Sequence, residues 1–219
     1  AVAVIDHGAA PPGISDRLFR FEYLAERIQS GAGLNAFAFP ANEIPLTLTR
    51  FQAVVASAPT RRPLIVMDTA PAAVLGALED PRVRAHQELV VVNIGNFHTL
   101  AFRFQNGSVV GLFEHHTGLL SPVRLEELLR QLAAGTLSND EVFADHGHGA
   151  LVLESTPTAL DFVAVTGPRR GLLAGSALQP YWAVPYGDMM MAGCWGLVRA
   201  CTWVLPWTAE AIERALAAL

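Results

Sequence analysis

Histidine is concentrated in four short glycine-containing clusters of this chain. Six of the seven histidines lie in them, and only His86 lies outside. The clusters are Asp6-His7-Gly8, Gly95-Asn96-Phe97-His98-Thr99, Glu114-His115-His116-Thr117-Gly118 and Asp145-His146-Gly147-His148-Gly149. Glycine lets backbone approach a ligand closely, and imidazole supplies a donor, an acceptor or a metal ligand near neutral pH. We therefore expect one shared polar site, and for any single cluster hydrogen bonding within a loop is the alternative.

Metal binding is one chemistry that these clusters could perform. His146 and His148 are two residues apart, so in an extended loop both could face one ion, with Asp145 as a carboxylate ligand. Of the adjacent pair His115 and His116, only one can point into a given site, because neighbouring strand residues face opposite sides. These five residues are the candidate ligands of a transition metal, and backbone hydrogen bonding in glycine-rich loops is the alternative.

Two aspartates are candidates for acid–base chemistry. Asp6 and Asp68 each follow a short apolar run that is typical of a strand. In a parallel-type sheet the carboxyl ends of the strands line the ligand crevice. Either aspartate could serve as the base or the magnesium partner of a phosphotransferase, and His98 is the third candidate catalytic residue.

A phosphate could be bound at two glycine turns. The candidate residues are Gly95, Asn96, Thr99, Gly167, Arg169 and Arg170. The first three would offer backbone N–H groups and a hydroxyl at a hairpin turn, and the arginines could clamp phosphate or carboxylate. A tight turn without a ligand and a solvated arginine pair are the alternatives.

The elements that must position these residues follow from apolar periodicity and turn residues. Strands are expected at 1–5, 64–67, 88–94, 97–104, 108–115, 160–165 and 181–184. Helices are expected at 17–29, 46–57, 70–78, 122–134, 186–204 and 209–219, with a short one opening at 138–141 and a loop at 31–45. Gln105-Asn106-Gly107 is a strong hairpin signal, so residues 88–116 are predicted to form a three-stranded antiparallel meander.

From residue 88 the order of elements is three strands, then alternating helices and strands. This order resembles the ribonuclease H-like mixed α/β sheet of actin, the heat-shock chaperone ATPases and the sugar kinases. VVNIGNFHTL (91–100) resembles their second phosphate hairpin, MDTAPAAVLGAL (67–78) their connecting segment and VAVTGPRR (163–170) their adenosine-binding turn. The last long helix, with Gly187, Gly193 and Gly196, resembles their closing helix, which packs tightly on the connecting one.

The resemblance to these ATPases implies a ribonuclease H-like domain at 88–219 and a remainder of an amino-terminal lobe at 1–87. It also implies a nucleotide or other phosphate ligand, with ATP and magnesium as candidate cofactors.

The sequences of several motifs are similar to those of a prokaryotic family labelled "putative pyruvate formate-lyase activating enzyme". The motifs are VMDTAPAAVLGALEDP, GLFEHHTG, GHGA, VTGPRR and PYGDMMMAGCWGL. A radical enzyme of that kind needs three closely spaced cysteines for its iron–sulfur cluster, and this chain has two in total. We therefore expect neither an iron–sulfur cluster nor radical S-adenosylmethionine chemistry.

Two departures from the ATPase pattern lower the expected rate of ATP hydrolysis. Asn93 stands where the second phosphate hairpin normally has aspartate, and an amide cannot act as a base and is a poor partner for magnesium. No first phosphate loop precedes Ala1, so the chain resembles an amino-terminally shortened member. We expect a phosphate-ligand protein with slow turnover, and the alternatives are a metal-dependent hydrolase and a non-catalytic binding protein.

Composition excludes several partners. The chain has no lysine, 15 arginines and a net charge of −5, so nucleic acid is not an expected partner. The 52% hydrophobic content favours a filled core, a surface buried between copies of the chain, or both. The apolar run at 189–205 contains Arg199, which favours a buried helix over a membrane span. Two cysteines seven residues apart fit a reducing, cytoplasmic location.

Overall fold

The computed structural model of the chain describes residues 1–59, 62–157 and 160–219. It contains a three-stranded sheet of order β1-β3-β2 and a six-stranded sheet of order β7-β6-β5-β4-β8-β9. The small sheet consists of β1 (Val2–Ala3), β2 (Ala38–Pro40) and β3 (Ile65–Met67). The large sheet consists of β4 (Glu88–Ile94), β5 (His98–Gln105), β6 (Ser108–His116), β7 (Gly149–Val152), β8 (Val163–Thr166) and β9 (Tyr181–Trp182).

The meander predicted between residues 88 and 116 is confirmed. β4 pairs antiparallel with β5, and β5 pairs antiparallel with β6. At the turn between β5 and β6, Asn106 and Gly107 both have positive φ (51° and 77°), which suits a tight hairpin between twisted strands. β8 runs parallel to β4, with Val163 opposite Val90. The sheet is therefore mixed, with antiparallel and parallel neighbours.

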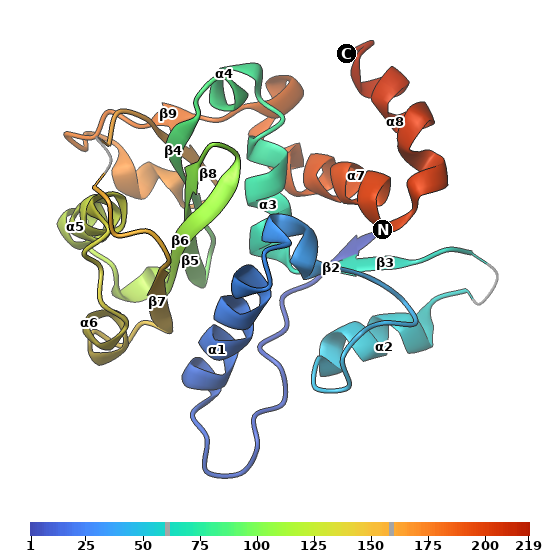
Figure 1. Cartoon of the computed structure of the whole chain (residues 1–219), viewed down its shortest axis with the longest axis horizontal. Coiled ribbons are helices and arrows are strands. Elements are labelled where there is room, and N and C mark those ends of the chain that lie inside the picture. Colours follow the sequence, from blue (N-terminus) through green and yellow to red (C-terminus); the bar gives the residue numbers. More distant parts are fainter. Residues whose placement is uncertain (60–61, 158–159) are drawn as a thin grey trace.

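Helices cover both faces of the large sheet (Figure 1). On one face, α5 (Pro122–Ala134) and α6 (Asn139–Ala144) share a core with Val90 and Val92. On the other face, α1 (Asp16–Gln29) and α3 (Thr69–Ala77) share a core with Val91. Because successive strand residues point to opposite faces, the position of a residue along its strand decides which core it joins.

Helices α3 and α7 (Ala192–Val204) cross at very short range, and α8 (Ala209–Leu216) follows α7 (Figure 1). A Cβ atom at Gly76 would stand 1.7 Å from the carbonyl oxygen of Ala192, and one at Gly196 would stand 1.8 Å from that of Ala72. The backbones can approach this closely only because both positions are glycine. Gly193, which the sequence grouped with Gly196, faces open space.

The structure differs from the sequence expectations in several places. Residues 31–45, expected as a loop, contain a 3-10 turn and β2. The helix expected at 186–204 begins at Ala192, because Tyr186 and Gly187 have positive φ and interrupt it. Strand β7, which begins at the last residue of the fourth histidine cluster, was not predicted. A short helix, α4 (Pro81–Arg84), was not predicted, and α2 (Thr49–Ser57) begins later than expected.

Of the helices in the described ranges, none combines the length and the apolar character that crossing a bilayer requires.

Candidate functional site

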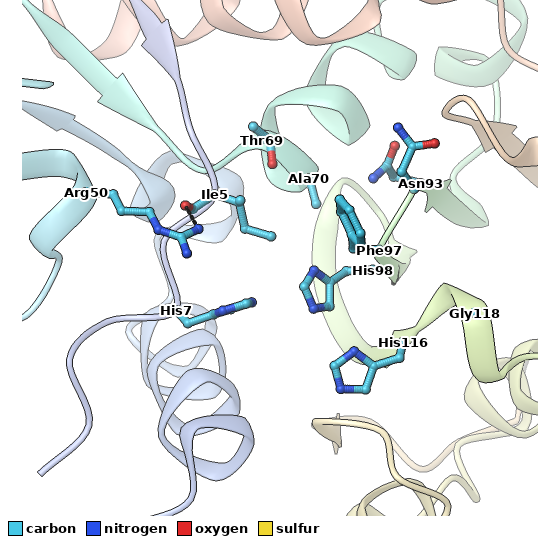
Figure 2. Close-up of a pocket in the computed structure, with 12 residues that line it drawn as sticks. Ile5, His7, Arg50, Thr69, Ala70, Asn93, Phe97, His98, His116 and Gly118 are labelled. Atoms are coloured by element: carbon cyan, nitrogen blue, oxygen red, sulfur yellow. Dashed lines mark hydrogen bonds between the residues drawn. The ribbon is translucent and has the colours of Figure 1, made fainter.

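A cavity of about 910 Å³ lies where the chain leaves β1, β3 and β4 (Figure 2). These three strands end at the same region, which is where ligands bind in open α/β sheets. The residues that line the cavity are Ile5, His7, Arg50, Thr69, Ala70, Asn93, Gly95, Asn96, Phe97, His98, His116 and Gly118. The cavity thus joins the segment after β1, the first turn of α3 and the β4–β5 hairpin.

One imidazole from each of the four histidine clusters converges here: the rings of His7, His98 and His116 line the cavity, and that of His148 lies beside them. The ring centroids of His7 and His98 are 4.8 Å apart, and those of His98 and His148 are 4.9 Å apart. His116 lies 4.5 Å from His148 by the same measure. The rings come from the segment after β1, the start of β5, the end of β6 and the residue before β7. Four segments that are far apart in sequence therefore contribute to one group of imidazoles.

Strand alternation explains why only one histidine of the 115–116 pair reaches the site. His98 is paired with His116 in the ladder between β5 and β6, and Thr99 is paired with His115. His116 therefore shares a sheet face with His98 and lines the cavity. The His115 side chain is buried on the other face, where its Nε2 lies 2.9 Å from the carbonyl oxygen of Asp145.

Burial keeps the imidazoles of the site neutral. It lowers the pKa of His98 to about 4 and that of His148 to about 3, although the Glu114 carboxylate acts in the opposite direction. Burial also lowers the pKa values of His7 and His116. Near pH 7 each ring therefore keeps an unprotonated nitrogen that can accept a hydrogen bond or bind a metal ion.

A fully buried arginine of α1, Arg20, ties three segments of the site together. Its Nε donates to Glu114 at 3.0 Å, and one terminal nitrogen donates to Asp68 at 2.5 Å and to the carbonyl oxygen of Asp6 at 3.0 Å. Burial acts to raise the pKa of Glu114, but the charge and hydrogen bond of Arg20, together with the neighbouring His148 and His98, lower that pKa to about 2. An ionised carboxylate is thus held beside His98 and His148.

Asp6 and Asp68, the two candidate bases, lie next to the cavity but do not line it. Asp6 accepts hydrogen bonds from the backbone N–H groups of Gly8, Arg50 and Phe51 at 2.7–3.0 Å, and so holds the start of α2. Asp68 caps α3 through the N–H of Ala70 and binds Arg20. Both carboxylates are buried and already hydrogen-bonded, because each accepts hydrogen bonds from backbone N–H groups at the start of a helix.

The first group of candidate phosphate residues divides between the two faces of the large sheet. Gly95 and Asn96 line the cavity, and the Gly95 N–H closes the hairpin turn on the carbonyl oxygen of His98 at 2.9 Å. Thr99 points away, since its hydroxyl lies 2.9 Å from that of Thr117 in the opposite core.

The second group of candidate phosphate residues lies outside this cavity. A Cβ atom at Gly167 would meet the carbonyl oxygen of Ile94 at 2.5 Å, so this glycine serves close backbone packing. Arg169 lines a separate, smaller pocket with Thr117, and the Arg170 guanidinium lies 5.8 Å from the ring of Trp182. The structure therefore does not bring Gly167, Arg169 and Arg170 to the imidazoles.

The candidate metal ligands expected from sequence spacing do not lie together either. His146 is exposed and has a φ of 64°, whereas His148 is buried, so the two do not face one ion. The expectation assumed an extended chain, and the left-handed backbone at His146 breaks that geometry. Asp145 binds Arg124 at 2.7 Å and lies beside His115 rather than beside the convergent rings.

Four residues of the site had no role assigned from the sequence. His7 and Glu114 stand within two of the histidine clusters, so their motifs contained the signal. Arg50 and Arg20 lie in ordinary helical segments, and nothing in their spacing distinguishes them from surface arginines. Their positions depend on how α1 and α2 pack, which the local sequence does not show.

The fold and the site define a mixed α/β protein with four imidazoles at a cavity where strands of two sheets end. A protein-family model described as "Putative pyruvate format-lyase activating enzyme" matches residues 1–172, and the chain belongs to this family. The matched part includes every residue that lines the cavity, as well as His148. No curated protein matches the chain.

Proposed function

We propose that the cavity binds a small phosphate-bearing molecule, either a nucleotide or a compound such as a sugar phosphate. The charge of the cavity carries this proposal. Among the described residues that line it, Arg50 is the one with a formal charge near pH 7, and none of them is a carboxylate. Arg50 donates one hydrogen bond to the carbonyl oxygen of Ile5 at 3.0 Å, which leaves further donors of its guanidinium for an anion.

The order of strands supports the same proposal. Three antiparallel strands, β6-β5-β4, continue into β8 and β9 with parallel pairing. This order resembles that of the ribonuclease H-like sheet, and we propose that the chain is related to the actin-like ATPases and sugar kinases. The β4–β5 hairpin, which resembles their second phosphate hairpin, provides Asn93, Gly95 and Asn96 to the cavity.

Phosphoryl transfer is the reaction class that this relationship implies, with ATP and magnesium as cofactors. The carboxylates of Asp6 and Asp68 already accept hydrogen bonds from backbone N–H groups at the starts of helices, and Asp68 also binds Arg20. Asn93 has no negative charge with which to bind a magnesium ion. Phosphoryl transfer depends on positioning and charge neutralisation around the phosphate. We therefore expect residues 1–219 to bind nucleotide more readily than they hydrolyse it.

Calorimetric titration with ATP, ADP, a hexose phosphate and inorganic phosphate, in excess magnesium and with a chelator selective for zinc and other transition metals, tests the proposal. Arg50→Ala should weaken phosphate binding by roughly tenfold to a hundredfold, because a hydrogen bond to a charged group contributes about 1.5–3 kcal/mol. Arg130→Ala is the matched control, because Arg130 lies on the exposed side of α5 and pairs with Glu126. Equal effects of both variants, or no binding of any phosphate, would refute the proposal.

A metal-dependent hydrolase is the second candidate, favoured by the convergence of four imidazoles beside the anion-binding cavity. A metal ion lowers the pKa of bound water and so supplies a nucleophile near neutral pH. Hydrolysis of p-nitrophenyl phosphate that requires zinc or manganese, and that His148→Ala abolishes while His146→Ala does not, would support it. Phosphate binding without turnover of this ester or of ATP would instead identify a non-catalytic binding protein.

A further inference from the structure

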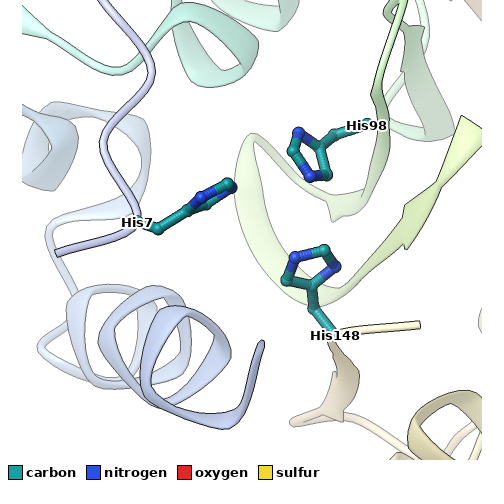
Figure 3. A group of neighbouring side chains, drawn as sticks. All are labelled: His7, His98 and His148. Carbon is teal, nitrogen blue, oxygen red and sulfur yellow. The ribbon is translucent and has the colours of Figure 1, made fainter. Parts of the chain in front are cut away.

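We propose that His7, His98 and His148 form a site for one divalent transition-metal ion that prefers imidazole ligands, with zinc as the representative. One ring nitrogen from each of the three residues lies within 4.8 Å of the other two (Figure 3). The three rings come from parts of the chain that are far apart in sequence, and they gather around a common centre. The ion would link the segment after β1 to β5 and to the start of β7.

Unpartnered nitrogen atoms are the second observation that points to an ion. Nε2 of His7, Nδ1 of His98 and Nδ1 of His148 are each buried and lack a hydrogen-bond partner among the described residues. His148 is only 2% exposed, so water cannot readily satisfy its ring. Buried polar atoms without partners are uncommon because they cost free energy. A metal ion bound to these nitrogens would satisfy all three residues at once.

The distances are compatible with a modest closure around zinc. Zinc–nitrogen bonds of about 2.0–2.1 Å place the nitrogens of a tetrahedral site roughly 3.3 Å apart. Nitrogens that are now up to 4.8 Å apart have to move inward by about 1 Å or less.

One side of the proposed metal site faces the cavity. His7 and His98 both line the cavity, whereas His148 does not line it and is buried. Three protein ligands with a free coordination position are typical of catalytic rather than structural zinc sites. His116, whose ring centroid is 4.5 Å from that of His148, borders the same cavity. The metal site thus extends the proposed phosphate site, but its existence does not depend on it.

Titration of the chelator-treated protein with Co²⁺ tests the inference, because the visible absorption of Co²⁺ reports its ligands and their number. One ion should bind per chain, and Zn²⁺ should displace it. His7→Ala, His98→Ala and His148→Ala should each lower the affinity by at least about tenfold. His146→Ala is the matched control: this histidine is two residues from His148 but exposed, and its variant should bind Co²⁺ as the parent protein does.

Three outcomes would overturn the inference: no binding of Co²⁺ or Zn²⁺ at millimolar concentration, binding that survives all three variants, or an equal loss in His146→Ala. If His148→Ala fails to fold, His7→Ala decides, since His7 is partly exposed and its removal leaves no core cavity. The titration contains no phosphate, and the phosphate titration contains chelator. Failure of the metal site and failure of the phosphate site are therefore seen separately.

Discussion

Arg20 shows how a single residue can hold the site together. Its guanidinium binds Glu114, Asp68 and the carbonyl oxygen of Asp6, which belong to β6, the start of α3 and the segment after β1. The side chains of Arg20, Glu114 and Asp68 are all buried. The carbonyl contact to Asp6 fixes the backbone next to His7, and the contact to Glu114 fixes the strand end that carries His116. Arg20 is thus a positioning residue, because it acts through the segments it binds.

Replacing Arg20 by methionine should strongly destabilise the protein. Removing one partner of a buried ionic network leaves carboxylates buried without compensation, which costs roughly 3–5 kcal/mol. Urea unfolding followed by circular dichroism measures the change in the free energy of unfolding. Arg130→Met, at an exposed arginine of α5, should change it by about 0.5 kcal/mol or less. A loss below about 1 kcal/mol in Arg20→Met would show that the network has no such role.

Replacing Asp6 by alanine tests whether this aspartate has a structural role rather than that of a base. The substitution removes the acceptor for the N–H groups of Arg50 and Phe51 and should cost roughly 1–2 kcal/mol of stability. Phosphate binding should weaken only as far as Arg50 is displaced. An Asp6→Ala variant that keeps its stability but loses all turnover of a phosphate ester would restore the base assignment.

At the scale of elements, the crossing of α3 and α7 places the start of α3 at the cavity. Gly76 and Gly196 let the two backbones meet without side chains between them. Gly193 lies on the same helix as Gly196, but nothing stands within 4 Å of a Cβ atom built there. The two positions of α7 therefore separate the effect of close approach from the general preference of helices for alanine.

Gly196→Ala should lower the free energy of unfolding by several kcal/mol, whereas Gly193→Ala should leave it unchanged or raise it by up to about 1 kcal/mol. The first substitution forces the helices apart, since its Cβ would stand 1.8 Å from the carbonyl oxygen of Ala72. Thermal unfolding of the two variants measures the difference. Equal melting temperatures would mean that the helices do not cross as closely as described.

The sequence predicts the elements of the large sheet better than those around residues 31–45. The hairpin signal at Asn106-Gly107 and the β-branched run of β4 are local, and both predictions are confirmed. β2 and β7 were not predicted, because short strands without strong alternation are defined by their neighbours rather than by their own residues. The start of α7 was misplaced because a left-handed Tyr186 gives no local signal.

The candidate site was predictable in part for a related reason. The glycine-containing histidine clusters indicated that distant segments of the chain meet at one site, and one ring from each cluster does lie there. Spacing alone could not choose between His146 and His148, because that choice depends on one φ angle. The roles of Arg20 and Arg50 were missed because the contacts of their guanidinium groups, to Glu114 and to the carbonyl oxygen of Ile5, span 94 and 45 residues of sequence. Such contacts are tertiary and leave no periodic pattern.

At the scale of the whole molecule, a metal ion at the three histidines would join the segment after β1 to the large sheet. Binding only to the folded state stabilises it, by about 2.7 kcal/mol when the free ion is at roughly 100 times its dissociation constant. Zinc should therefore raise the melting temperature of the parent protein and of His146→Ala. The increase should be lost in His7→Ala, and an undiminished increase there would place the ion elsewhere.

The most direct test of the shared site is anomalous X-ray scattering from crystals of the zinc-treated protein, recorded on both sides of the zinc absorption edge. We predict one strong peak per chain, at about 2.0–2.2 Å from one ring nitrogen each of His7, His98 and His148. A crystal without a peak at these residues, or with its strongest peak at the exposed His86 or His146, would contradict a shared metal site at the histidine clusters.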